Sequence, residues 1–165
     1  MKVAIVIPAH NEETRIRRTL HEYGSYFRDL KKKKILDFEI IVVLNACKDN
    51  TRGVVEDSKF PELRIVEFKR GGKGFAVIEG FKDALARNSD LIGFTDADLA
   101  TPPASFHSLL NAINGYEGVI ASRYVPGARI SPPRLFVREV ISRVFNFVVR
   151  SLFLLSVFTR SQCWR

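Results

Sequence analysis

At 165 residues, of which 46% are hydrophobic and 27% charged, the chain has the length and composition of one globular domain with a single core, which excludes a largely disordered protein. The net charge of +8 is uneven, because residues 1–117 carry 18 Lys and Arg against 17 Asp and Glu, whereas residues 118–165 carry 8 against 1. This asymmetry favours an anionic partner for the tail, either a nucleic acid or a lipid surface.

Strand and helix patterns alternate along the chain. The run 2–7 is apolar and β-branched, as in a buried strand, and apolar residues then recur at helical spacing from Ile16 to Phe27. In chain order the patterns predict a strand at 2–7, a helix at 12–30, a strand at 38–44, a helix at 51–57, a strand at 63–68, a helix at 76–86, a strand at 91–95, a helix at 104–113 and a strand at 118–122. This alternation predicts a three-layer α/β fold with a mainly parallel sheet.

The C-terminal part differs in character. After a loop at 124–133, residues 135–158 form a long apolar stretch of helical type, and four arginines fall on or beside it: Arg134, Arg138, Arg143 and Arg150. We therefore divide the chain into a domain of residues 1–133 and a basic apolar helical tail of residues 134–165. The segment 144–158 is too short to span a bilayer, whereas a basic apolar helix suits a membrane interface. A core helix that packs on further sequence is the alternative, and the sequence leaves both open.

Cysteine usage and the N-terminus bear on the compartment. Cys47 and Cys163 have no metal-type spacing and imply no disulfide framework, so we expect a reducing, cytoplasmic setting. Met1 and Lys2 lead directly into the first strand, so no signal peptide is expected.

Two aspartates one residue apart, Asp96 and Asp98, follow the predicted strand at 91–95. Parallel α/β sheets bind ligands beyond the carboxyl ends of their strands. Two carboxylates there repel each other unless a cation or a proton lies between them. Mg²⁺ or Mn²⁺ is the expected cation, because hard cations prefer oxygen ligands and share them with substrate phosphates. The alternative is a solvated turn.

Other polar clusters follow the neighbouring predicted strands, at 8–13, 45–51 and 70–74, and Ser122-Arg123 follows the last. The Gly-Gly-Lys-Gly turn at 71–74 could hold a phosphate through backbone N–H groups and the lysine charge, although it is not a Walker P-loop. Each cluster alone is weak. Their shared sheet edge predicts a site for a phosphorylated, metal-bound substrate.

In order and spacing these clusters resemble the family-2 glycosyltransferases, whose fold is the nucleotide-diphospho-sugar transferase (GT-A, Rossmann-like) fold. The matching segments are IPAHNEE (7–13), Lys48–Thr51, Gly72–Ala76, TDADLATPP (95–103) and Ala121–Arg123. Two further segments, Arg143–Asn146 and Gln162-Cys163, are similar to polyprenyl-phosphate sugar synthases, including dolichyl-phosphate glucosyl- and mannosyltransferases.

The resemblance implies a role for particular residues. It assigns donor binding to Pro8, Ala9, Asn11, Glu12, Asn45, Lys73, Gly74 and Asp96, with Asn45 at the position of a base-reading aspartate. It assigns metal binding to Asp96 and Asp98, and catalytic roles to Asp98, Lys73 and Arg123, with Arg123 facing a phosphate such as that of the acceptor.

The chain also departs from the family pattern. Leu44-Asn45 replaces Asp-Asp, and Asn offers a donor as well as an acceptor where Asp offers acceptors only, so the base preference stays open. Ala100 cannot coordinate a metal. The last residues, 160–165, diverge from the family ending, which points to a truncated or shortened form.

Together these features predict metal-assisted, inverting transfer of a sugar from a nucleotide-diphospho-sugar to a polyprenyl or dolichyl phosphate, on the cytoplasmic face of a membrane and in protein glycosylation. UDP-glucose is the favoured donor and GDP-mannose the next. A phosphate acceptor is already anionic, so no general base is required, and His10 is expected to line the pocket or to be structural.

Three alternatives remain. The first is a nucleotide-sugar-binding fragment without activity. The second is a basic nucleic-acid-binding module, which the apolar setting of the tail phenylalanines disfavours. The third is a nucleotidyltransferase, for which no triphosphate site is evident.

Overall fold

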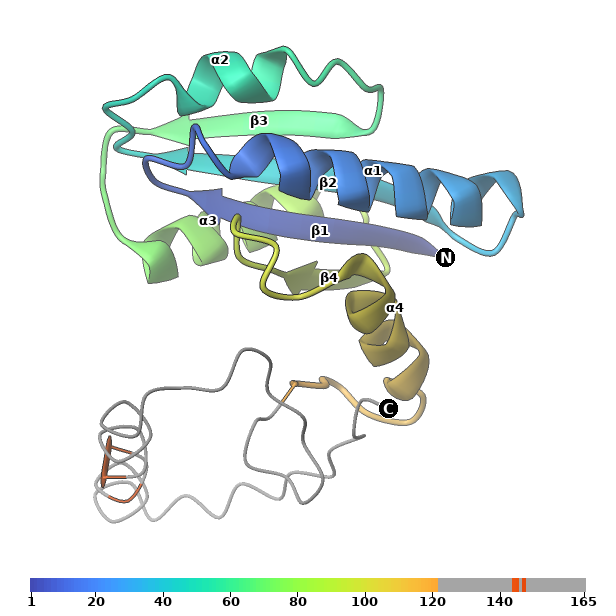
Figure 1. Ribbon diagram of the computed structural model, residues 1–165. Helices are drawn as coiled ribbons and strands as arrows, with labels where there is room; N and C mark the ends of the chain where they lie inside the picture. The colour runs from blue at the N-terminus through green and yellow to red at the C-terminus, as the bar shows by residue number, and fades with distance from the viewer. Residues whose placement is uncertain (122–143, 146, 148–165) are drawn as a thin grey trace. The chain divides into compact units, whose positions relative to one another are not determined.

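The computed structural model describes residues 1–121 together with 144, 145 and 147 (Figure 1). The chain divides into two compact units, residues 1–108 and 109–165. All strands among the described residues, and the cavity discussed below, belong to the first unit.

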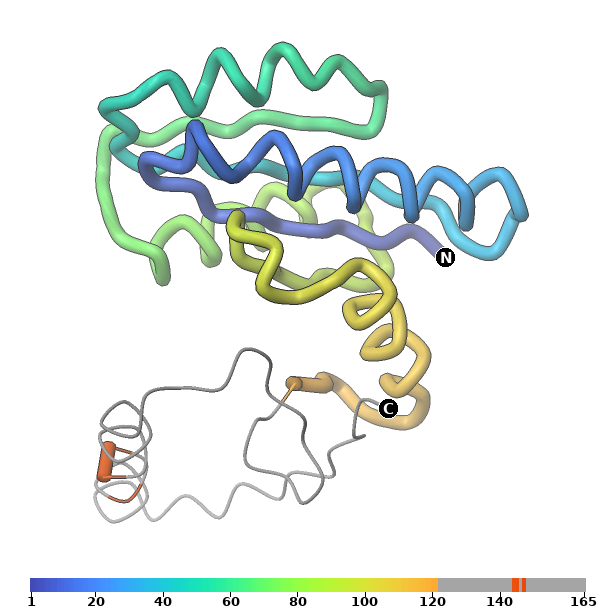
Figure 2. The backbone as a smooth tube through the Cα atoms, in the orientation of Figure 1, coloured from blue at the N-terminus to red at the C-terminus, as the bar shows by residue number. Residues whose placement is uncertain are grey.

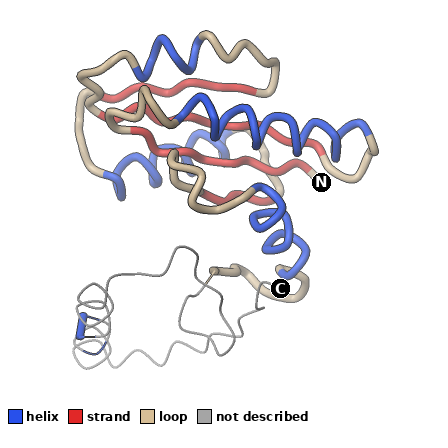
Figure 3. The backbone as a smooth tube through the Cα atoms, in the orientation of Figure 1, coloured by secondary structure: helices blue, strands red, loops and turns tan. Residues whose placement is uncertain are grey.

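The first unit is built on a four-stranded sheet of order β3-β2-β1-β4, coloured red in Figure 3. Its strands are β1 (Lys2–Ala9), β2 (Asp37–Asn45), β3 (Leu63–Phe68) and β4 (Leu91–Phe94), and every neighbouring pair is parallel. β1 and β2 are buried almost throughout, because both lie inside the sheet between layers of helices. The predicted parallel α/β sheet is therefore confirmed.

The helices are α1 (Ile16–Lys32), α2 (Thr51–Glu56), α3 (Lys73–Ala86) and α4 (Pro103–Ala112). The first two lie on one face of the sheet and α3 lies on the other, as the ribbon and the backbone tube show (Figures 1 and 2). The result is the predicted three-layer arrangement.

The layer under α1 has an aromatic core. Tyr23 and Phe27 of α1 are fully buried, and Phe27 packs on Phe38 of β2 with ring centroids 5.6 Å apart. Phe106 of α4 meets Tyr23 edge to face at 5.9 Å. The Tyr23 hydroxyl lies 2.9 Å from the carbonyl oxygen of Thr101, so it holds the chain that follows β4 onto α1. Burial raises the pKa of Tyr23 to about 12, although a hydrogen bond with Thr95 lowers it, so the side chain is neutral at physiological pH.

On the opposite face, α3 approaches the sheet through small residues. Ala76, Gly80 and Ala84 are its buried positions. A Cβ atom at Gly80 would lie only 2.4 Å from Cγ1 of Val6 and 3.0 Å from Cγ2 of Val43. This close approach fixes α3 on β1 and β2, and with it the position of the helix N-terminus at the carboxyl edge of the sheet.

Two helices begin three or more residues away from the expected start. α1 begins at Ile16 and not at 12, because residues 13–15 form a turn, in which the carbonyl oxygen of Glu12 accepts the N–H groups of Arg15 and Ile16. α3 begins at Lys73 and not at 76, because Gly72, with φ of 127°, ends the turn and its carbonyl oxygen accepts the N–H of Ala76 at 3.0 Å.

The strand expected at 118–122 is not formed over its described part. Residues 118–121 are irregular and exposed or nearly so, whereas Ser122 lies outside the described residues. A strand exists only through backbone pairing, and the described sheet contains no partner for this segment. The apolar content of the run therefore did not suffice to make it a strand.

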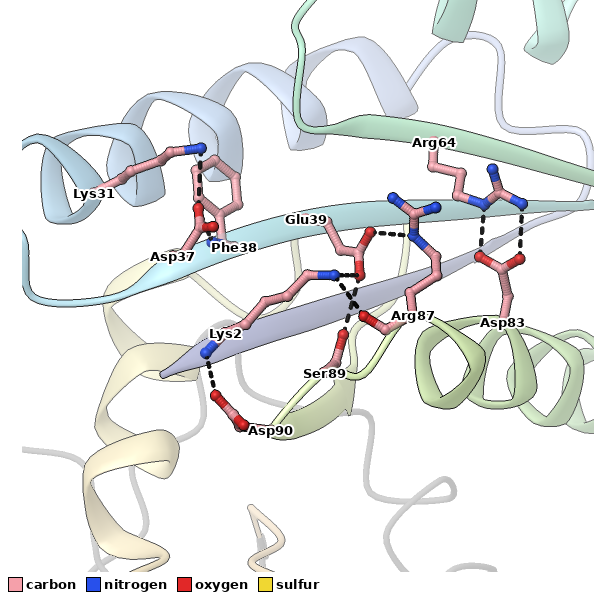
Figure 4. A network of polar contacts seen from close by, with 10 residues as sticks. All are labelled: Lys2, Lys31, Asp37, Phe38, Glu39, Arg64, Asp83, Arg87, Ser89 and Asp90. Atoms are coloured by element: carbon pink, nitrogen blue, oxygen red, sulfur yellow. Dashed lines mark hydrogen bonds and ion pairs between the residues drawn. The ribbon is translucent and has the colours of Figure 1, made fainter.

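The amino-terminal edge of the sheet carries a polar network, shown in Figure 4. Glu39 of β2 is buried, and its carboxylate accepts hydrogen bonds from Arg87 Nε at 2.7 Å and Ser89 Oγ at 3.0 Å. Lys2 Nζ lies 2.8 Å from the same carboxylate. Burial alone raises the pKa of Glu39, but these hydrogen bonds outweigh it and hold the pKa below its ordinary value.

Almost all of the predicted tail of residues 134–165 lies outside the described residues, and so does the boundary predicted at 133. Val144, Phe145 and Phe147 are helical. Among the residues that are described, none of the helices has the length and hydropathy of a membrane-crossing segment. The interfacial role of the tail stays a prediction.

Candidate functional site

A cavity of about 450 Å³ lies at the carboxyl edge of the sheet, where the loops after β1, β2, β3 and β4 meet. It is lined by Pro8, His10, Glu12, Asn45, Gly71, Gly72, Lys73, Asp96, Ala97 and Asp98. The polar clusters that follow four strands in the sequence are thus brought together around one space. This convergence follows from the parallel sheet, since the carboxyl ends of parallel strands share one edge.

The two aspartates lie in a loop that the core holds in place. The carbonyl oxygen of Ala97, between them, accepts a buried hydrogen bond from the Thr19 hydroxyl of α1 at 2.7 Å. Asp98 Oδ1 accepts the backbone N–H of Ala100 at 3.0 Å. Asp96 Oδ1 lies 2.6 Å from Lys73 Nζ, in an ion pair that crosses from the loop after β4 to the start of α3.

These carboxylates fit a divalent cation that is shared with a substrate. In the described part of the chain, no group of three or more His, Cys, Asp or Glu side chains could hold a metal ion by itself. Mg²⁺ is commonly bound through one or two carboxylates, with substrate phosphates and waters as the other ligands. Asp96 and Asp98 supply this smaller donor set, and the cavity beside them leaves room for the substrate oxygens.

The glycine turn forms a second wall of the cavity. Gly71 and Gly72 precede α3, and Lys73 is the first residue of that helix. The backbone N–H groups at a helix N-terminus and its positive dipole end favour anions, and the Lys73 ammonium adds a full charge. Phe75 of α3 packs edge to face on Phe68 with ring centroids 5.2 Å apart, which anchors the turn to the end of β3. This wall suits an anionic ligand such as a phosphate.

Asn45, the last residue of β2, forms hydrogen bonds through both ends of its side-chain amide. It is 3% exposed. Its Nδ2 donates to the carbonyl oxygen of Ala9 at 2.9 Å, and its Oδ1 accepts the N–H of Gly72 at 3.1 Å. Its own carbonyl oxygen lies 2.7 Å from His10 Nδ1. Since a carbonyl oxygen only accepts, Nδ1 carries the proton, and in the neutral ring Nε2 is an acceptor.

A second set of contacts joins the loop after β1 to the loop after β2. Asn11 Oδ1 accepts the N–H of Lys48 at 2.8 Å, and the N–H of Glu12 donates to Thr51 Oγ1 at 2.8 Å. The Asp49 carboxylate accepts the N–H groups of Glu13 and Thr51. Burial raises the pKa of Asp49, but the hydrogen bonds from Thr51 and these amides outweigh it, so the pKa is lowered. Sequence reasoning gave Asp49 no role of its own, although an aspartate can bind the backbone N–H two residues on in an Asx turn, as Asp49 does with Thr51.

The cavity includes six of the residues predicted for donor or metal binding, namely Pro8, Glu12, Asn45, Lys73, Asp96 and Asp98. Three others are placed differently: Ala9 is buried and offers its carbonyl oxygen to Asn45, Asn11 binds the loop after β2, and Gly74 lies in the first turn of α3. Arg123 lies outside the described residues. Nothing in the sequence pattern marked His10 as a partner of Asn45. All assigned roles remain predictions.

Comparison with known proteins supports the resemblance seen in the motifs. The model of the family "Glycosyl transferase family 2" matches residues 4–165. A dolichol-phosphate mannosyltransferase of Pyrococcus furiosus is 36% identical over 146 residues, which cover 87% of this chain and 39% of that protein. A dolichyl-phosphate beta-glucosyltransferase of Trichomonas vaginalis is 35% identical over 128 residues, which cover 75% of this chain and 37% of that protein. The chain thus spans well under half the length of these two relatives.

Solved structures share the fold. Glucosyl-3-phosphoglycerate synthase from Mycobacterium tuberculosis, in complex with UDP, aligns with a TM-score of 0.62 at 24% identity and covers 91% of this chain and 50% of that one. S. aureus TarS aligns with a TM-score of 0.53 at 21% identity, covering 79% and 40%. At these identities the likeness shows the fold alone, and it confirms the predicted sugar-nucleotide transferase architecture.

Proposed function

We propose, because the chain belongs to glycosyltransferase family 2, that it binds a nucleotide-diphospho-sugar and transfers the sugar to a polyprenyl phosphate such as dolichyl phosphate. The observation that carries the proposal is the cavity at the sheet edge, which places Lys73, Asp96 and Asp98 around one space. Such a space combines acidic groups for a cation with a basic wall for phosphate.

The diphosphate of the donor is the ligand that uses both walls. When bound at Asp96 and Asp98, Mg²⁺ or Mn²⁺ supplies positive charge to the leaving diphosphate. Glucosyl-3-phosphoglycerate synthase, which shares the fold, has been crystallised with Mn²⁺ and UDP-glucose. The N-terminus of α3 adds fixed positive charge at the glycine turn, and the Lys73 ammonium, 2.6 Å from Asp96 Oδ1, adds it beside the carboxylates. Both charges stabilise the negative charge that accumulates as the sugar leaves. Asp98 is held by the Ala100 amide, so its direction is set before the ligand arrives.

The acceptor chemistry needs no base from the protein. An oxygen of the acceptor phosphate forms the new bond to the anomeric carbon of the sugar, and the bond from that carbon to the diphosphate breaks, with both electrons leaving on the nucleoside diphosphate. A direct displacement of this kind inverts the anomeric centre. The acceptor oxygen is already anionic, so no proton has to be removed. Arg123 is proposed to face the acceptor phosphate.

We favour UDP-glucose as the donor, because Leu99-Ala100-Thr101 after the aspartates is similar to the glucosyl branch, and GDP-mannose is the nearest rival. The dolichyl-phosphate relatives include enzymes named for each sugar. The basic tail would hold the protein on the cytoplasmic face of a membrane, where a lipid phosphate is found. This setting would place the reaction in protein glycosylation.

The first test is thermal stabilisation of the full chain by UDP-glucose and by GDP-mannose, with and without Mn²⁺. A ligand at one hundred times its dissociation constant adds about 2.7 kcal/mol to the free energy of unfolding. We expect one of the two donors to stabilise the native chain, and to do so only when Mn²⁺ is present. The variant Asp98→Asn should lose this stabilisation. Asp29→Asn, on the exposed surface of α1 and in an ion pair with Lys32, is the matched control that keeps it.

The second test is transfer of radiolabelled sugar to dolichyl phosphate in detergent, with Asp98→Asn beside the native chain. Product from the native chain and not from the variant supports the proposal. Stabilisation without product identifies a donor-binding fragment without activity. Equal metal-dependent stabilisation of Asp98→Asn and the native chain would refute the metal role.

A further inference from the structure

We propose that Asn45 is a positioning residue, whose side-chain amide fixes the glycine turn of Gly71 and Gly72 against the end of β1 and does not read the nucleotide base. The inference deepens the proposed function, because the cavity that Asn45 orders is the proposed donor site. It reverses the role that the motif resemblance gives this position.

Both ends of the Asn45 amide already bind the backbone. Nδ2 donates to the Ala9 carbonyl oxygen at 2.9 Å, and Oδ1 accepts the Gly72 N–H at 3.1 Å. The side chain is also 3% exposed, and a base that took the place of either bond would leave one of these backbone groups without its partner. A buried backbone group that loses its partner is unfavourable, and the Gly72 N–H and the Ala9 carbonyl would both be at risk.

The contacts of Asn45 lead directly to the groups proposed for catalysis. Gly72 precedes Lys73, and its carbonyl oxygen accepts the N–H of Ala76, so the hydrogen bond from Asn45 reaches the first turn of α3. Lys73 in turn pairs with Asp96 across the cavity. A shift of the glycine turn would therefore move the ammonium group that faces the metal and phosphate side of the site.

The residue after Asn45 lies beside the turn. A Cβ atom added at Gly71 would lie 3.7 Å from the Cβ atom of Ala46, so the two residues are neighbours in space. The N–H of Ala46 donates to the carbonyl oxygen of Phe68, the last residue of β3, at 2.8 Å. Residues at the end of β2 thus bind the chain on both sides of Gly71, because Ala46 binds Phe68 and Asn45 binds Gly72. Asn45 also binds Ala9 at the end of β1.

The two backbone contacts of Asn45 require an amide and not a carboxylate. An ionised aspartate has acceptors only, so it could receive the Gly72 N–H but would direct a negative charge at the Ala9 carbonyl oxygen. A protonated carboxyl, in contrast, has one hydroxyl donor and one acceptor, as the amide has. Burial beside the Ala9 carbonyl oxygen raises the pKa of such a carboxyl, although the Gly72 N–H lowers it, and we expect the net shift to be upward.

These properties make Asn45→Asp the decisive variant. Above the raised pKa we expect the variant to bind UDP in the presence of Mn²⁺ about tenfold more weakly than the native chain, because one buried hydrogen bond is replaced by a repulsion. As the pH falls toward 5.5, the ratio of the UDP affinity of the native chain to that of the variant should return toward one. The ratio for GDP should follow the same course, because the base is not read by this residue.

Controls address the other groups that titrate or carry charge near Asn45. His10 binds the Asn45 carbonyl, Cys47 Sγ donates to the Ala9 carbonyl at 3.4 Å, and Lys73 and Asp96 line the same cavity. All four are present in both chains, so comparison with the native chain at each pH separates their contribution. Asn50→Asp, which adds the same charge at an exposed position of the same loop, should show no pH-dependent ratio.

A change in the preference between UDP and GDP in Asn45→Asp, with no dependence of the ratio on pH, would overturn the proposal and make Asn45 a base-reading residue. If the variant does not fold, hydrogen exchange in the native chain still tests the proposal. The Nδ2 proton of Asn45 that donates to Ala9 and the Gly72 N–H that donates to Asn45 Oδ1 should both remain protected from hydrogen exchange, with and without UDP and Mn²⁺. Fast exchange of either proton in either state would contradict the bond that it makes.

The proposed function can fail separately. If the native chain binds neither nucleotide, the sugar-transfer proposal falls, and thermal unfolding of Asn45→Asp still tests the positioning role. A midpoint that is lowered at pH 8 and recovers toward the native value at pH 5.5 supports that role. A midpoint equal to the native one at both pH values refutes it.

Discussion

Substitution of Gly80 by alanine should destabilise the chain, although the same change in an exposed helix is stabilising. The added methyl group would lie 2.4 Å from Val6 Cγ1 and 3.0 Å from Val43 Cγ2. Both valines are fully buried and β-branched, so neither side chain can rotate away freely. Overpacking of this kind costs about 1–3 kcal/mol, and an overlap at 2.4 Å belongs in the upper part of that range.

The difference in helix propensity has the opposite effect on stability. Alanine is favoured over glycine inside a helix by about 1 kcal/mol. The net loss in the free energy of unfolding should therefore be about 1–2 kcal/mol. Gly74 provides the matched control, because it lies in the same helix and a Cβ atom there would meet nothing within 4 Å. Gly74→Ala should be neutral or stabilising by up to about 1 kcal/mol.

Urea denaturation of the full chain, followed by circular dichroism at the helix band, measures both variants. The midpoint for Gly80→Ala should fall and that for Gly74→Ala should stay or rise, with slopes equal to that of the native chain. If Gly80→Ala proved as stable as the native chain, α3 would not lie as close to β1 and β2 as described. The account of how Lys73 is positioned would fail with it.

Two further predictions concern the core and the amino-terminal edge. Tyr23→Phe removes a hydroxyl that hydrogen-bonds Thr95 and Thr101, so the free energy of unfolding should fall by about 1–2 kcal/mol, measured by the same urea titration; no change would show that these bonds are not formed in solution. The pKa of Glu39 is lowered in the folded chain, so its contribution to stability is complete above the ordinary value of 4.5 and is lost as the pH falls through the folded pKa. In Glu39→Gln the free energy of unfolding should therefore be lower than the native value at pH 7, and the difference should shrink below pH 4.5; a difference that is constant with pH would contradict the charge-based role of Glu39.

The alternation of strand and helix patterns sufficed to predict the parallel sheet, and the parallel sheet sufficed to predict that Lys73 would lie near Asp96. Both inferences need only the periodicity of apolar residues and the common direction of the strands. The strand order was not predicted, because it depends on which faces pack together and not on any local pattern. The strand expected at 118–122 was wrong over its described residues for the same reason, since an apolar run does not reveal whether a pairing partner exists.

Within the site, residue types were easier to predict than the atoms that meet. Asn45 was placed at the cavity as expected, but its amide binds Ala9 and Gly72, and motif position alone pointed to a base. Whether Asn45 binds the backbone or a base depends on how closely the neighbouring loops approach its amide. That spacing is set by packing between segments far apart in the sequence. The substitution of Asp by Asn was the available signal, because only the amide can donate and accept at once.

The polar network around Glu39 lies at the starts of the strands, whereas the cavity lies at their ends. An engineer who wished to raise the heat tolerance of this chain could randomise Lys2, Arg87 and Ser89 and screen for folded clones without altering any residue that lines the cavity. Libraries confined to the amino-terminal edge of the sheet should leave the residues that line the cavity at the carboxyl edge unchanged.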